Sequence, residues 1–144
     1  MTRIAQLGIA VGALGAMITI MGLFPGVTGL PPTAGIGLVQ IFTVLIGYTL
    51  LIWGALIYVK FTFYSFSHSN LAQQIGTRFA LTGLVLAAMT ALADVLGFGS
   101  HGLISDSTVF LGQLQALGIV LNFLLSAIGV MIYAISGNPD QNGR

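Results

Sequence analysis

The stretch GIGLVQIFTVLIGYTLLIWGALIYVK, residues 35–60, decides the fold class of this chain. It contains no charged side chain before Lys60 at its end. An α-helix needs about 20 mostly apolar residues to cross the roughly 30 Å hydrocarbon core of a bilayer. The apolar residues are continuous and do not alternate with polar ones, which argues against a strand of a membrane barrel. The stretch therefore predicts a transmembrane helix over 35–59.

Three further apolar stretches accompany it, and the composition indicates that lipid is the solvent for most of the chain. Of the 144 residues, 56% are hydrophobic and 5% charged, with a mean hydropathy of +1.02. A soluble domain carries about 25% charged residues. We expect helices over about 4–23, 35–59, 71–96 and 109–135. The sequence thus predicts an all-α integral membrane protein, a single four-transmembrane-helix bundle over 1–144.

Local signals support two of these boundaries. The first apolar stretch is longer than the core of a typical signal peptide and no A-x-A cleavage site follows it, so we expect a retained helix. Asn70 and Gln73 have the spacing of a capping box, which predicts that the third helix begins near Leu71. The aromatic run after Lys60 belongs at the headgroup level. It either lies in the membrane interface or extends the second helix.

The four basic residues predict the orientation. Arg3, Lys60, Arg78 and Arg144 all fall on one side of a four-span arrangement, and the segments joining helices 1–2 and 3–4 contain no Lys or Arg. Short cytoplasmic segments carry the excess of Lys and Arg. We therefore expect both termini in the cytoplasm and the protein in a bacterial-type cytoplasmic membrane.

Charge and residue counts exclude several function classes. With a net charge of +1, the chain has too few basic residues to form the dense basic face that nucleic-acid binding needs. The absence of cysteine excludes disulfides, thiol redox chemistry and thiolate metal ligands. His68 and His101 lie on opposite sides of the predicted membrane, so they cannot form the axial pair of one haem. We expect no enzymatic activity and no cofactor.

Small and polar residues within the predicted helices are candidates for helix packing. Gly8, Gly12 and Ala16 form a small-residue stripe at four-residue spacing, with Gly15 beside it. Such stripes let the backbone of a second helix approach closely. The sequence leaves open whether that helix belongs to the same chain or to a neighbouring copy. The side chain of Asn122, midway along the fourth helix, is interpreted as forming a hydrogen bond to a neighbouring helix. The alternative is that it contacts a substrate.

The two halves of the chain show a weak internal repeat. A shift of 75 positions places Gly37 on Gly112, Gln40 on Gln115, Gly54 on Gly129 and Ile57-Tyr58 on Ile132-Tyr133, whereas helices 1 and 3 align poorly. Since both hairpins would start on the same side, a duplication would produce two parallel-related helical hairpins. Apolar composition alone also produces such matches, so the repeat stays a hypothesis.

Three ionisable residues gather in the segment between helices 3 and 4. Asp94, His101 and Asp106 are candidate ion or proton sites, because an acid within a membrane often couples to ions or protons. Asp94 is expected near the outer edge of the membrane, where a structural role at the helix end competes with this interpretation. Asp106 with Ser107 and Thr108 also fits the N-cap of the fourth helix.

These observations favour a non-catalytic membrane protein. It would act through helix packing, either as an accessory subunit of a membrane complex or as a homo-oligomer, with the lipid bilayer and other membrane subunits or its own copies as partners. The alternative is a small channel or proton-linked transporter that uses Asp94 and Asn122. A third hypothesis is a quinone-site subunit whose redox centre comes from a partner.

Overall fold

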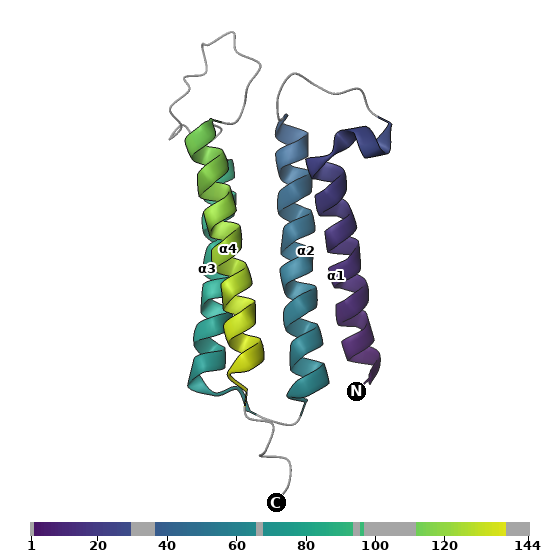
Figure 1. Cartoon of the computed structure of the whole chain (residues 1–144), viewed down its shortest axis with the longest axis vertical. Helices are drawn as coiled ribbons and strands as arrows, with labels where there is room; N and C mark the ends of the chain where they lie inside the picture. The colour runs from purple at the N-terminus through teal and green to yellow at the C-terminus, as the bar shows by residue number, and fades with distance from the viewer. Residues whose placement is uncertain (1, 30–36, 66–67, 94–95, 97–111, 138–144) are drawn as a thin grey trace, which may run out of the picture.

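The computed structural model describes residues 2–29, 37–65, 68–93, 96 and 112–137. The chain forms two antiparallel helical hairpins that stand side by side, as Figure 1 shows. The elements in chain order are α1 (Thr2–Leu23), the short 3-10 helix η1 (Pro25–Thr28), α2 (Leu38–Phe63), α3 (Leu71–Ala91) and α4 (Gln113–Ile135). Helices pack closely within each hairpin, α1 on α2 and α3 on α4, whereas contacts between the hairpins are sparse.

Both hairpins start at the same end of the bundle (Figure 1). We call the end where α1 and α3 begin the proximal end. The end where α2 and α4 begin is called the distal end. The hairpins therefore run in parallel directions, as two units related by rotation about an axis along the helices would.

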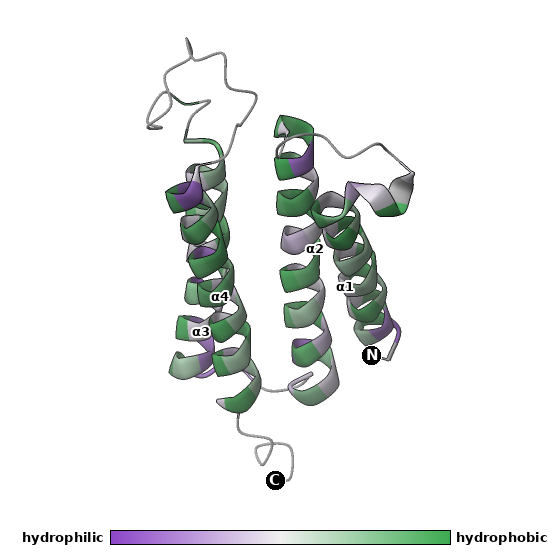
Figure 2. Ribbon diagram, turned by 45° about the horizontal axis from the view of Figure 1, so that its top comes forward, coloured by the Kyte–Doolittle hydropathy of each residue, from purple (hydrophilic) through white to green (hydrophobic). Residues whose placement is uncertain are grey.

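The helices are apolar on their outer faces as well as between them. Figure 2 shows hydrophobic residues along most of each helix. Large side chains such as Met17, Val39, Val85 and Met131 are 60–79% exposed. Among the described helices, Arg3–Leu23, Leu38–Phe63 and Gln113–Ile135 are long and apolar enough to cross a membrane. An all-helical protein with three such helices supports the predicted membrane class.

α3 does not reach the same level of hydropathy, because its first two turns are polar. They contain Gln73, Gln74, Thr77 and Arg78. Asn70 caps this start: its side-chain oxygen accepts the N–H of Gln73 at 2.8 Å, and the Gln73 side chain accepts the N–H of Asn70 at 3.2 Å. The predicted capping box and the start at Leu71 are confirmed.

The ends of α2 and α3 differ from the predicted ones. α2 continues through the aromatic run to Phe63 rather than ending at residue 59, and Tyr64 follows as its C-cap. α3 ends at Ala91 rather than at residue 96. The sequence after Leu96 contains Gly97 and Gly99, and glycine is a poor helix former. A glycine-rich continuation therefore favours an earlier end than hydropathy alone suggested.

The described start of the fourth helix lies later than the predicted residue 109. α4 begins at Gln113 and its N-cap is Gly112 in an extended conformation. The Gly112 N–H donates to the side-chain oxygen of Gln115 at 3.0 Å, which satisfies one of the amide groups that a helix start leaves unpaired. The acidic cap expected from Asp106, Ser107 and Thr108 lies outside the described residues.

Glycine makes the close approach of α1 and α2 possible. A Cβ atom on Gly54 would lie 2.5 Å from Gly12 Cα and 2.7 Å from the Gly8 carbonyl oxygen. A Cβ on Gly15 would lie 2.6 Å from the carbonyl oxygen of Gly47. Real Cβ atoms do not approach backbone this closely. The two backbones therefore touch only because these positions lack side chains.

The second hairpin repeats the same contact. A Cβ on Gly129 would lie 2.6 Å from the Gly76 carbonyl oxygen and 2.9 Å from Ala80 Cα. Gly129 corresponds to Gly54 at a shift of 75, since 129 − 54 = 75. Its contact residues correspond to Gly8 and Gly12 at a shift of 68, since 76 − 8 = 68 and 80 − 12 = 68.

The two shifts explain why the repeat is weak in the sequence. The segment between the helices is seven residues longer in the second hairpin, since 75 − 68 = 7. One shift therefore cannot align both helices of a hairpin. With separate shifts, the helices of the two hairpins pack in the same register.

Candidate binding cavity between the hairpins

The proximal ends of the hairpins are joined by an aromatic cluster. Tyr64, after α2, and Tyr133, on α4, are buried together with Val59. The two rings meet edge to face with centroids 6.3 Å apart, and the Tyr64 hydroxyl donates to the carbonyl oxygen of Ala134 at 2.6 Å. This cluster ties the first hairpin to the end of the second.

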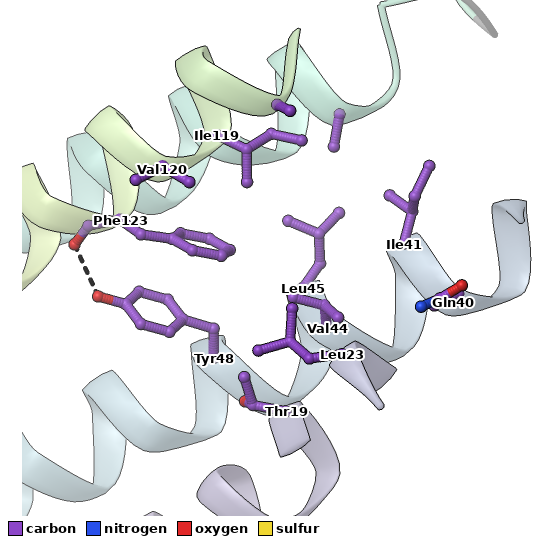
Figure 3. A pocket seen from close by; sticks show the side chains of 12 residues that line it. Thr19, Leu23, Gln40, Ile41, Val44, Leu45, Tyr48, Ile119, Val120 and Phe123 are labelled. Atoms are coloured by element: carbon purple, nitrogen blue, oxygen red, sulfur yellow. Dashed lines mark hydrogen bonds between the residues drawn. The ribbon is translucent and has the colours of Figure 1, made fainter. Parts of the chain in front are cut away.

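A second contact joins the hairpins halfway along the helices. The rings of Tyr48 on α2 and Phe123 on α4 stack with centroids 3.9 Å apart and an interplanar angle of 21°. The Tyr48 hydroxyl donates to the Phe123 carbonyl oxygen at 2.6 Å, as Figure 3 shows. These two residues are 75 positions apart, the shift that relates α2 to α4. Equivalent residues that touch each other lie on the axis relating the two hairpins.

A cavity of about 410 Å³ lies on the distal side of this stacked pair. Its walls come from all four helices, with most residues from the distal halves of α2 and α4 (Figure 3). Four wall positions recur as equivalent pairs in the two hairpins: Leu23 and Ala91, Ile41 and Ala116, Val44 and Ile119, and Leu45 and Val120. The cavity is therefore centred on the same axis as the stacked pair that forms its floor.

The cavity walls that the structure describes are almost entirely hydrocarbon. The hydroxyl of Thr19 donates to the Gly15 carbonyl oxygen at 2.8 Å, and that of Tyr48 is used by the contact with Phe123. Gln40, in the first turn of α2, is the remaining polar residue of the described wall, and its side chain forms no hydrogen bond with any described residue. None of the wall residues that the structure describes is an acid, a histidine or a base. The described part of the wall suits an apolar molecule.

The glycine stripe predicted on the first helix lies against α2 of the same chain. A Cβ on Gly8 would lie 2.7 Å from the Tyr58 nitrogen. Gly12 faces Gly54 with more room, and Ala16 is half-buried beside them. Gly15, noted in the sequence only as a neighbour, makes one of the tightest approaches. The stripe is thus occupied by the hairpin partner.

Asn122 lies in the interface between α3 and α4, away from the cavity. Its side-chain amide donates to the Thr90 hydroxyl at 3.3 Å. One turn further on, the Ser126 hydroxyl, fully buried, donates to the Ala80 carbonyl oxygen at 3.0 Å. Sequence reasoning did not single out Ser126, although its spacing of four residues from Asn122 places both on one helix face.

The three ionisable candidates, Asp94, His101 and Asp106, lie outside the described residues. Among the residues that the structure describes, no group of three His, Cys, Asp or Glu side chains is placed to hold a metal ion.

Sequence reasoning also missed Tyr48 and Phe123. The shift of 75 that pairs Gly54 with Gly129 also pairs these two residues, and that signal was present in the sequence. Comparisons with protein-family models, with curated proteins and with solved structures find no match to this chain.

Proposed function

We propose that all four helices cross a bacterial-type cytoplasmic membrane with both termini in the cytoplasm. α3 is included as a fourth span because its full length of 21 residues suffices and its charged and amide side chains lie in its first two turns, at one end of the helix. Arg3, Lys60 and Arg78 all lie in the proximal part of the bundle. Since cytoplasmic segments carry the excess of basic residues, this distribution supports a proximal end that faces the cytoplasm.

Cysteine labelling tests this orientation, since the chain has no cysteine of its own. Val27, at the distal end, is 70% exposed. Val27→Cys is therefore expected to react with a membrane-impermeant maleimide that is added outside intact cells. His68→Cys, exposed at the proximal end, is expected to react only after the membrane is opened. Labelling of His68→Cys in intact cells would reverse the orientation.

Within that membrane, the protein is proposed to be non-catalytic and to act through apolar helix contacts, as an accessory subunit of a membrane complex or as a homo-oligomer. One observation carries this proposal. The polar side chains between the helices, such as Tyr48, Asn122 and Ser126, are bonded within the chain. The described surface that remains for partners is therefore mainly aliphatic.

Native mass spectrometry from lipid nanodiscs tests this proposal. A reproducible complex, with copies of the chain or with other membrane proteins, is the expected result. A monomer that never co-purifies with a membrane partner would contradict it. If a complex forms through the exposed face of α4, Leu121→Asn should weaken it, because Leu121 is 56% exposed and an amide facing a partner helix needs a bond.

A small transporter or channel is the second candidate, favoured by the repeat of two hairpins around one axis. Asp94 would then bind the transported ion or proton. Asp94→Asn should abolish the flux of that ion or proton into vesicles without unfolding the protein. An Asp94 that serves only at a helix end should leave flux and folding unchanged when it becomes Asn.

A further inference from the structure

The cavity between the hairpins lies within the depth of one membrane leaflet. Its α2 wall runs from Gln40 to Tyr48, eight residues or about 12 Å along a helix. Half of a roughly 30 Å hydrocarbon core is about 15 Å. If the distal end faces outward, as proposed above, the cavity spans the acyl-chain region of the outer leaflet.

The chemistry of the described walls disfavours water as a stable occupant. A buried water needs two to four polar partners. The Thr19 and Tyr48 hydroxyls donate to carbonyl oxygens of the chain, and the other described wall residues, apart from Gln40 at the distal end, are aliphatic or aromatic. An apolar cavity with such walls stays dry unless a hydrocarbon enters it.

The size of the cavity and its position between all four helices favour a small flexible ligand over a helix of a partner or of a second copy. The cavity holds about 410 Å³, within the range of small-molecule sites. A single flexible hydrocarbon chain fits this volume.

The position of the polar groups distinguishes a lipid tail from a ligand that is polar at its inner end. The floor is the stacked Tyr48–Phe123 pair, whose hydrogen bond is already made. The amide of Gln40 lies in the first turn of α2, at the distal end of the cavity. A molecule seated here would bury hydrocarbon against the floor and keep its polar group at the distal end.

We propose that the distal cavity between the hairpins is a binding site for one acyl chain of an outer-leaflet phospholipid, inserted tail first as far as Tyr48 and Phe123. The site rests on the proposed membrane orientation but not on any protein partner. The acyl chain would fill the apolar space between the distal halves of the two hairpins, which make few direct contacts. The surrounding leaflet supplies the lipid.

Photolabelling in nanodiscs tests the site. The purified protein is placed in phosphatidylcholine nanodiscs containing a small fraction of phosphatidylcholine with a diazirine at the end of one acyl chain. After illumination, labelled peptides are mapped by mass spectrometry. We expect labelling at Val44 and Ile119, on the inner walls, to exceed that of Phe42, which is 43% exposed on the same helix as Val44.

Filling the cavity should remove this labelling. Ala116→Phe projects a ring into the space opposite Ile41 and should lose most of the wall labelling. The double variant Ala91→Leu with Ala116→Ile introduces the residues found at the equivalent positions 23 and 41, and should have the same effect if the phenylalanine disturbs folding. Leu117→Phe, at a 55% exposed position next to Ala116, is the matched control and should keep the labelling.

Two results would overturn the assignment. One is labelling confined to exposed residues and unchanged in both cavity variants. The other is wall labelling by a diazirine-bearing isoprenoid quinone but not by the phospholipid. Because the labelling is read on the isolated chain, its failure leaves the proposed partner contacts untouched. The cysteine experiment reports separately on the orientation.

Discussion

Gly54→Ala is expected to destabilise the protein by about 1–3 kcal/mol, although it adds a single methyl group. The added carbon would lie 2.5 Å from Gly12 Cα and 2.7 Å from the Gly8 carbonyl oxygen. Both are backbone atoms that cannot rotate aside, so α1 and α2 must move apart. Unfolding in mixed detergent micelles should report a lower free energy of unfolding.

Gly12→Ala provides the matched control on the same contact. A Cβ on Gly12 would lie 3.8 Å from Gly54 Cα, which is ordinary van der Waals distance. The equivalent position of the second hairpin already carries alanine, Ala80, with no exposed surface. The free energy of unfolding should therefore stay the same or rise slightly, because alanine is the better helix former. Equal loss in both variants would contradict the register in which α1 packs on α2.

Tyr64→Ala should release the two hairpins from each other at their proximal ends. Truncating a buried aromatic residue costs about 3–5 kcal/mol in a packed core, and Tyr64 is 6% exposed. The hydrogen bond to the Ala134 carbonyl oxygen is lost as well. Spin labels on Met17→Cys in α1 and Val85→Cys in α3, both on exposed faces, should report a broader distance distribution by electron–electron double resonance.

Two further variants separate the effect of the lost Tyr64 hydrogen bond from the effect of the lost ring. Tyr64→Phe keeps the ring and removes the hydrogen bond, so a loss of only about 1 kcal/mol is expected. Phe63→Ala truncates the neighbouring ring, which is 58% exposed, and should leave the distance distribution narrow. An unchanged distribution in Tyr64→Ala would mean that the remaining contacts, among them the stacked pair of Tyr48 and Phe123, suffice to hold the hairpins together.

The difference between Gly54 and Gly12 could not be read from the sequence. Both are glycines in apolar helices, and a spacing pattern treats them alike. What separates them is the direction of each Cα–Cβ vector relative to the opposing backbone. That direction depends on the register and rotation of two helices whose contact residues are 42 positions apart, since 54 − 12 = 42.

The sequence did predict the features that depend on neighbouring residues. Continuous apolar stretches predicted four helices, because hydropathy adds up along the chain. The pair Asn70 and Gln73 predicted the start of α3, because a capping box involves only one helical turn. The same local reasoning missed Gly112 and Gln115, which cap the described start of α4 at Gln113.

The cavity and the contacts that bound it were decided by the tertiary structure alone. Tyr48 and Phe123 meet because two hairpins of the same internal register stand in parallel around one axis. In sequence, the seven-residue difference between the connecting segments hides that common register. Close packing depends on which backbone atoms face each other across helices, and a one-dimensional pattern of apolar and small residues does not contain that information.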